Sequence, residues 1–203
     1  MNSRQETNYM IITISRELGR RLPEQMQIPC YDKEIISLIA RNIGFDESYV
    51  EMMSEKGIQS AYLGTFSSRF ARVDWYTRQS IDIIAEQQKI IKDLASKGDC
   101  IIIGRAADLI LSDMKPFRIF VYADMASRMK RCREREEDRE KLSDAQLQKN
   151  IRKIDKERAS HRASFSDLKW GDKANYDLCI NTTDLSIEKI IVPLADLIRA
   201  HYQ

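Results

Sequence analysis

The sequence has little cysteine, glycine, proline or histidine. Its 203 residues include 4 Cys, 7 Gly, 4 Pro and 2 His. The cysteines are Cys30, Cys100, Cys132 and Cys179. They lie far apart and form no C-x-x-C pair, which argues against a zinc site or a thioredoxin-like motif. Three of them lie in apolar stretches, which favours buried, reduced thiols.

An excess of charge of one sign and long hydrophobic runs are also missing. Lys and Arg number 33 against 31 Asp and Glu, a net charge of +2. This balance argues against nucleic acid or an anionic membrane as the main partner. Apolar runs reach only about six residues, far short of the roughly 20 that span a bilayer. The first twelve residues carry no export signal pattern. We therefore expect a cytoplasmic protein.

What is present is a set of five short β-like runs separated by longer helical patterns. These runs are Tyr9–Ile14, Ile28–Tyr31, Cys100–Ile103, Phe117–Tyr122 and Tyr176–Ile180. Continuous apolar runs suit strands that are buried on both faces, as in a parallel sheet covered by helices. Strands that alternate with helices predict an α/β fold with a mostly parallel sheet.

Helical periods fill the intervals between these runs. The expected helices are 33–42, 46–56, 78–97, 128–139, 143–164 and a last one that starts at Ser186 and contains Pro193. The segment 57–76 has weak periodicity, and with 128–164 it is expected to form appendages on the sheet. No linker or repeat divides the chain, so we expect one domain over residues 1–203, with residues 1–8 frayed.

Polar residues follow the apolar runs where ligands bind in open parallel sheets, outside the carboxyl ends of the strands. They are Ser15, Arg16 and Glu17, then Asp32, then Gly104, Arg105 and Asp108, then Asp124, and finally Asn181, Thr182 and Thr183. Guanidinium groups match phosphate oxygens, and a carboxylate can hold magnesium. The set predicts a site for a phosphorylated ligand, although polar residues also end strands for structural reasons.

Six short strings in order resemble the cytidylate kinase-like family, a branch of the P-loop nucleoside monophosphate kinases. The strings are ITISRE (12–17), IPCYDKE (28–34), IGR (103–105), DKERA (155–159), WGD (170–172) and NYDLCINT (175–182). The resemblance extends over about residues 11–192. It implies a three-layer P-loop NTPase fold with a five-stranded, mostly parallel sheet, helices on both faces and a helical lid over about 128–164.

The resemblance also implies an ATP-dependent, magnesium-dependent kinase whose acceptor is a nucleoside monophosphate, CMP among them. Asp32 would lie near the acceptor phosphate or the magnesium ion. Arg105 would hold the monophosphate, and Arg158 and Arg162 would be lid arginines that neutralise the transferring phosphoryl group.

On the donor side, the resemblance assigns two stretches to ATP. Ser15, Arg16 and Gly19 stand where the family's phosphate loop begins, and Asn181, Thr182 and Thr183 would border the base. Trp170, by contrast, is expected to have a packing role, and His161 is expected to be solvated rather than a catalytic base.

The phosphate loop itself departs from the family pattern. A Walker loop reads G-x-x-x-x-G-K-[ST], whereas here Gly19 is followed by Arg20 and no lysine stands nearby. The 13 residues between Ile14 and Ile28 are too few for both a loop and a packing helix. Either about seven residues are missing between Gly19 and Arg20, which we favour, or the protein has lost the loop.

Three functions therefore stay open from the sequence. The first is the nucleotide kinase, and the second is a non-catalytic nucleotide- or anion-binding protein of the same fold that has lost the loop lysine. The third is an interaction module that uses the basic 128–162 region, against which the near-neutral charge argues. The acceptor and the oligomeric state are not readable from the sequence.

Overall fold

The chain folds around a five-stranded parallel sheet. The computed structural model describes residues 9–14, 16–19, 21–54, 70–135 and 142–203. The strands are β1 (Ile11–Ile14), β2 (Cys30–Tyr31), β3 (Cys100–Ile103), β4 (Phe117–Tyr122) and β5 (Leu178–Asn181). Their order is β2-β3-β1-β4-β5, and each neighbouring pair is parallel. The predicted α/β class and the parallel sheet are confirmed.

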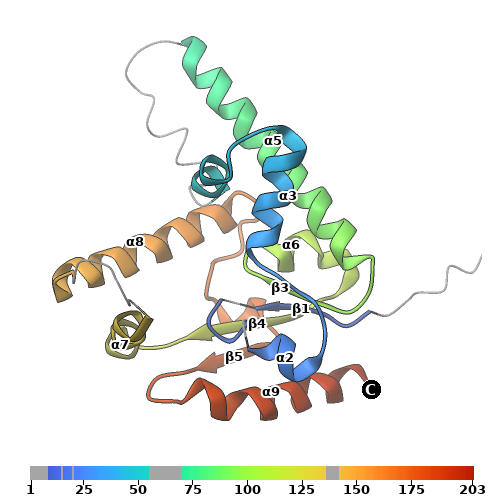
Figure 1. Cartoon of the computed structure of the whole chain (residues 1–203), viewed down its shortest axis with the longest axis vertical. Coiled ribbons are helices and arrows are strands. Elements are labelled where there is room, and N and C mark those ends of the chain that lie inside the picture. Colours follow the sequence, from blue (N-terminus) through green and yellow to red (C-terminus); the bar gives the residue numbers. More distant parts are fainter. Residues whose placement is uncertain (1–8, 15, 20, 55–69, 136–141) are drawn as a thin grey trace, which may run out of the picture.

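Helices cover both faces of this sheet (Figure 1). They are α1 (Arg16–Gly19), α2 (Leu22–Met26), α3 (Lys33–Ile43), a helix over 47–54, α5 (Phe70–Ala95), α6 (Ala107–Ile110), α7 (Met125–Arg135), α8 (Asp144–Ala163) and α9 (Ile187–Tyr202). Two short 3-10 helices, η1 (Ser112–Met114) and η2 (Lys173–Asn175), complete the described elements.

Alternation along the strands divides the core into two clusters, one on each face. Ile11 and Ile102 pack with α3, α5 and α6, whereas Ile12 and Ile101 pack with α2 and α9. All four side chains are at most 2% exposed. Burial on both faces explains why these strands read as continuous apolar runs.

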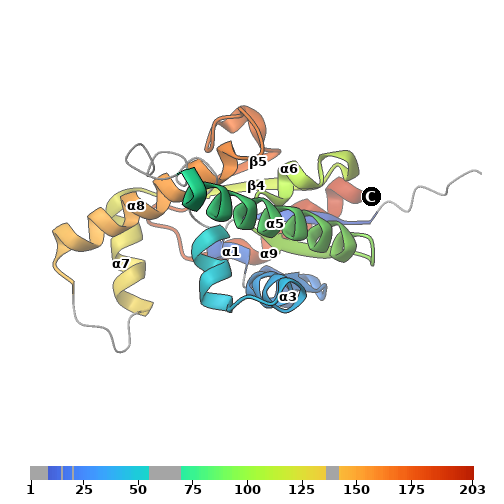
Figure 2. The ribbon, with the colours of Figure 1, turned by 90° about the horizontal axis from the view of Figure 1, so that it is seen from above.

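Helices α7 and α8 form an arm at one end of the molecule, opposite the C-terminus (Figures 1 and 2). Ser143 begins α8 with a capping box, in which its side chain accepts from the Gln146 backbone and the Gln146 side chain accepts from the Ser143 backbone. Arg128 of α7 makes two 2.7 Å bonds to the carboxylate of Asp155 on α8. The two helices are thus tied to each other.

Two parts of the expected helix pattern need correction. Helix α5 begins at Phe70, eight residues before the predicted start at Arg78, so part of the weakly periodic segment 57–76 is helical. The β1–β2 connection contains two short helices, α1 and α2, and Pro23 lies in the first turn of α2, where its missing N–H is tolerated. Residues 1–8 and the remainder of the appendage, 57–69, lie outside the described residues.

Candidate functional site

The carboxyl edge of the sheet brings Asp32 and Arg105 onto neighbouring strands. Asp32 follows β2 and Arg105 comes two residues after β3, and Tyr31 is in register with Ile102. After β1 the chain crosses to β2 on one side of the sheet, and after β3 it crosses to β4 on the other side of β1. The direction of the crossovers therefore reverses at β1. Parallel sheets bind ligands at this kind of edge. The two residues predicted to face the acceptor therefore share one rim.

Arg105 lies in a turn of unusual conformation. Gly104, Arg105 and Ala106 have φ angles of 67°, 59° and 52°. The left-handed region is open to glycine but costs other residues about 1–2 kcal/mol each. The Gly104 carbonyl accepts from the Ala107 N–H, and the Gln87 side chain donates to the Arg105 carbonyl at 3.1 Å. The surrounding structure holds Arg105 in a strained position at the rim.

His161 of α8 is buried near this turn, which overturns the expectation of a solvated histidine. It is 8% exposed, and its ring packs on Phe165 at 5.1 Å between centroids. Burial, together with the positive charge of Arg105, lowers the pKa of His161 to about 4. The side chain is therefore neutral at pH 7.

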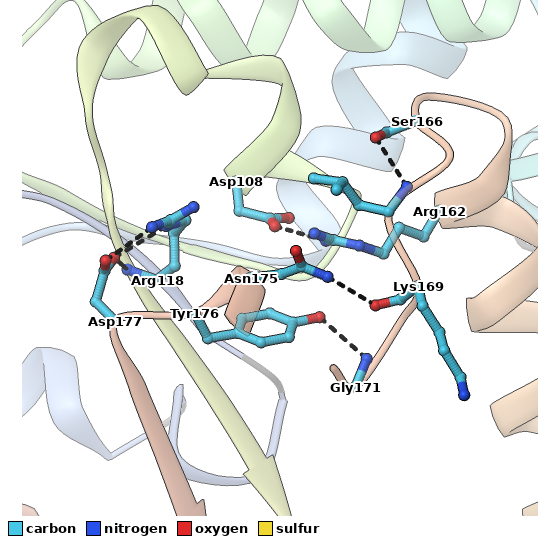
Figure 3. Close-up of polar contacts among 10 residues, drawn as sticks. Asp108, Arg118, Arg162, Ser166, Lys169, Gly171, Asn175, Tyr176 and Asp177 are labelled. Atoms are coloured by element: carbon cyan, nitrogen blue, oxygen red, sulfur yellow. Dashed lines mark hydrogen bonds and ion pairs between the residues drawn. The ribbon is translucent and has the colours of Figure 1, made fainter. Parts of the chain in front are cut away.

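Arg162 is buried too, in a contact that the sequence does not reveal. It is 5% exposed, and its Nη1 lies 2.5 Å from the carboxylate of Asp108 on α6. Its guanidinium carbon lies 5.3 Å from the centre of the Tyr176 ring. Figure 3 shows the side chain reaching from α8 toward Asp108 with the ring beside it. This conformation of Arg162 joins α8 to the body of the protein, whereas a lid arginine on a phosphoryl group must be accessible.

An aromatic cluster supports the ring of Tyr176. Phe120 stacks on Tyr176 at 4.8 Å and meets Trp170 edge-on at 5.5 Å. The Gly171 N–H donates to the Tyr176 hydroxyl at 3.4 Å (Figure 3). The packing role expected for Trp170 is confirmed.

Arg158, the other predicted lid arginine, lies on the exposed surface of α8. It precedes the buried His161 and Arg162 by about one helical turn. Its side chain is thus accessible in a way that Arg162 is not, and its role toward a phosphoryl group stays a prediction.

The predicted phosphate-loop residues do not form a cradle in the described part of the chain. Ser15 lies outside the described residues, as does the side chain of Arg16. Gly19 is buried, and a Cβ atom there would lie 2.7 Å from Cδ1 of Ile103 and 3.0 Å from Cγ2 of Ile14. The Gly19 carbonyl accepts from the Cys30 thiol at 3.4 Å. Gly19 thus packs against the sheet.

The residues at the end of β5 make hydrogen bonds to one another and to the end of β4. Thr182 is fully buried, and its hydroxyl donates to the Tyr122 carbonyl at 3.1 Å. The Thr183 hydroxyl accepts from the Asp124 N–H at 2.9 Å, and Asn181 Oδ1 accepts from the Thr183 N–H at 3.0 Å. The Thr182 side chain therefore has a structural role. A contact of Asn181 or Thr183 with a base stays a prediction.

A metal site made by the protein alone is not found among the described residues, which hold no cluster of three or more His, Cys, Asp or Glu side chains suited to a metal ion. Asp32 would be a single carboxylate ligand. A hollow of about 340 Å³ is lined by Gln88, Lys92, Leu109, Ile110, Ser112, Asp113 and Phe165. It contains none of the predicted site residues.

Sequence reasoning missed Gln87, Asp108 as a partner of Arg162, and the burial of His161. A signal for Gln87 exists, because it stands in the apolar stripe of α5 with Ile83 and Ile91, four residues to either side. A polar residue at such a position needs a hydrogen-bond partner.

Comparisons with known proteins agree with this architecture. A structure of an uncharacterized protein from Eubacterium ventriosum superposes with a TM-score of 0.67 over 94% of this chain and 98% of that chain, at 24% identity. This likeness concerns the fold. A search of curated proteins finds no match. No helix among the described residues is long and apolar enough to span a membrane.

The family model for the cytidylate kinase-like family matches residues 11–184, which include the rim and the whole of helices α7 and α8. The membership suggests a nucleotide kinase-like function. The chain belongs to the cytidylate kinase-like family.

Proposed function

We propose that the protein binds a nucleoside monophosphate, CMP being the first to test, at the carboxyl edge of β2 and β3. The observation that carries the proposal is the position of Arg105, held in a strained turn beside the strand that leads into Asp32. The forked guanidinium group supplies paired donors to a phosphate dianion. Strain in a backbone is a feature of ligand sites, where it fixes a side chain in advance.

The charge of the neighbourhood favours an anion. Arg105 is close enough to His161 to lower the pKa of the imidazole. His161 stays neutral and the Asp108 carboxylate is paired with Arg162. The imidazole beside Arg105 is thus neutral and the Asp108 carboxylate is already paired, which suits the approach of a phosphate group.

The residues present do not fit the triphosphate of ATP. A phosphate loop surrounds the phosphates with backbone N–H groups and adds a lysine. The chain has no lysine between Ile14 and Asp32, and Gly19 packs under Ile103. The full sequence has 203 residues and places Arg20 directly after Gly19, so the expectation that about seven residues are missing there is wrong. We therefore propose binding without phosphoryl transfer from ATP, which was the second of the functions that the sequence left open.

The ATP-dependent nucleoside monophosphate kinase is the second candidate, and membership of the family favours it. It needs ATP, a magnesium ion with Asp32 as a ligand, and an accessible arginine such as Arg158. It also needs donor phosphates to be held without a glycine-rich loop.

One set of measurements on the full chain separates the two candidates. Calorimetric titration with CMP, the other nucleoside monophosphates and ATP with Mg²⁺ gives the affinities, and a coupled assay reports turnover. We expect CMP to bind, ATP to bind at least tenfold more weakly, and no ADP to form. Turnover would establish the kinase, and absence of binding by every monophosphate would remove the proposal.

Two arginine variants locate the site. Arg105→Ala should raise the Kd for CMP by tenfold or more, because charged hydrogen bonds contribute about 1.5–3 kcal/mol. Arg41→Ala is the matched control, since Arg41 is an exposed arginine in the last turn of α3. It lies roughly 13 Å along the helix from Asp32. Equal effects of the two variants would show that Arg105 does not contact the ligand.

A further inference from the structure

The turn that carries Arg105 depends on a side chain from a distant helix. Gln87 is in α5, 18 residues before Arg105, and it is 1% exposed. Its Nε2 donates to the Arg105 carbonyl at 3.1 Å. A polar side chain this deeply buried is retained only where its hydrogen bonds are made.

The three consecutive carbonyl groups of this turn accept hydrogen bonds from different helices. The Gly104 carbonyl accepts from the backbone N–H of Ala107, and the Ala106 carbonyl accepts from the N–H groups of Leu109 and Ile110. The carbonyl between them, that of Arg105, accepts from the Gln87 side chain. The backbone of α6 thus serves the flanking carbonyls, and α5 serves the central one.

The conformation of the turn makes this third bond consequential. Arg105 and Ala106 both have positive φ angles, although neither is glycine. Such angles persist only where the surroundings fix them. Releasing the Arg105 carbonyl would let both residues return to negative φ, and the Arg105 side chain would then leave its position at the rim.

We infer that Gln87 is a positioning residue, which holds Arg105 in the left-handed turn and so presents its guanidinium group to the phosphate of the bound nucleotide. The identity of the ligand, a phosphate monoester, rests on the proposed function. The effect of Gln87 on the conformation of the turn does not. It gives a buried residue of α5 a part in binding although it touches no ligand.

Binding is tested with a double-mutant cycle on the full chain, using CMP as the probe. Gln87→Met keeps the length of the side chain and removes the donor. We expect it to raise the Kd for CMP about tenfold. Because it acts through Arg105, it should have less than a twofold further effect in the Arg105→Ala background. Gln88→Met, on the exposed neighbour in the same helix, should change the Kd less than twofold. An unchanged Kd in Gln87→Met, or additive effects in the double variant, would overturn the inference.

A second measurement decides the effect on the turn whether or not CMP binds. Backbone chemical shifts and HN–Hα couplings report the sign of φ at Arg105 and Ala106 in the folded protein. We expect positive φ in the wild type and in Gln88→Met, and negative φ for both residues in Gln87→Met. A wild type that does not bind CMP would remove the proposed function alone. A Gln87→Met variant that keeps both positive φ angles would remove the positioning role.

Discussion

Asp108 and Arg162 show how a buried charge depends on more than one partner. Their side chains are 11% and 6% exposed. Asp108 also acts on Arg118, whose pKa is raised chiefly by its hydrogen bond to Asp177 and in part by Asp108. Arg162 has two nitrogens, Nε and Nη2, that are buried without a hydrogen-bond partner among the described residues. The arginine therefore depends more heavily on the pair than the aspartate does.

This asymmetry predicts unequal costs for the two halves of the pair. Asp108→Asn leaves a buried guanidinium group, and we expect it to lower the free energy of unfolding by about 3–5 kcal/mol. Arg162→Met should lower the free energy of unfolding by less, because the Asp108 carboxylate still interacts with the positive charge of Arg118. Urea denaturation measures both. The control is Arg21→Met in the exposed pair with Glu188, which should change stability by less than about 1 kcal/mol. A larger loss in Arg162→Met than in Asp108→Asn would contradict the argument.

His161 makes the stability depend on pH in a defined direction. Its pKa is about 4 in the folded protein, against an ordinary value of 6.5. The unfolded chain therefore binds the proton more tightly, and the contribution of the neutral imidazole is complete above pH 6.5 and lost as the pH falls toward 4. Between pH 7.5 and pH 5 the wild type should lose about 2 kcal/mol through this residue.

The test compares the wild type with His161→Leu in urea at the two pH values. The variant lacks the titrating group, so its stability should fall by about 2 kcal/mol less over this interval. The difference between the two free energies of unfolding at pH 7.5 gives the effect of the substitution on packing alone. Parallel losses in the two proteins would show that His161 titrates normally.

At the scale of elements, the connection between β1 and β2 is where the sequence lacks the Walker loop pattern. Gly19 ends α1 against Ile103, which is 3% exposed and has a stiff, branched side chain. A Cβ at Gly19 would lie 2.7 and 2.8 Å from two atoms of Ile103. Alanine is more favourable than glycine in a helical backbone. A loss of stability in Gly19→Ala would therefore come from the contact with Ile103.

We expect Gly19→Ala to lower the free energy of unfolding by about 1–3 kcal/mol, as overpacking does. Ile103→Val removes the Cδ1 atom and should recover at least half of that loss in the double variant. Ile103→Val alone should cost about 0.5–1.5 kcal/mol. Thermal and urea unfolding of the three variants measure these changes. A stabilised Gly19→Ala would mean that α1 does not press Gly19 onto the sheet.

The elements that the sequence predicts best are those whose whole environment is apolar. The strands at Cys100 and Phe117 begin as expected, since burial on both faces leaves an unbroken apolar run. The predicted start of α5, Arg78, is wrong by eight residues. Figure 1 shows the N-terminal part of this helix projecting beyond the other elements. Hydrophobic periodicity predicts a helix from its apolar face alone, so it does not fix where the helix begins.

The candidate site is less readable, because its contacts join distant segments. Arg162 and Asp108 are 54 residues apart, and the Gln87 bond to Arg105 spans 18. Nothing in a charged run such as ERASHR distinguishes a buried histidine from a solvated one. The rim residues after each strand could be predicted because the parallel topology places them, whereas the pairs depend on how α5, α6 and α8 pack.

At the scale of the whole molecule, the sheet joins two hydrophobic cores through the same strands. Strands β1 and β3 supply alternate side chains to both clusters, and both lie in the interior of the sheet. Ile39 of α3 and Ile198 of α9 belong to opposite clusters, and both are fully buried. Neither cluster can lose its packing without exposing strands that the other also needs. The single domain expected from the sequence is therefore predicted to unfold as one unit.

Substitutions in the two cores test this coupling. Ile39→Ala and Ile198→Ala should each lower the free energy of unfolding by about 2–5 kcal/mol, the cost of a large-to-small change in a packed core. Each variant should show one transition in urea, with the same midpoint by far-UV circular dichroism and by fluorescence, because cooperative unfolding makes all probes coincide. Native-state hydrogen exchange should be slowest at the same β1 amides in both variants, since these amides exchange only through global unfolding. Two transitions, or a loss of protection confined to the substituted face, would show that α9 and its cluster unfold independently of the α3 side.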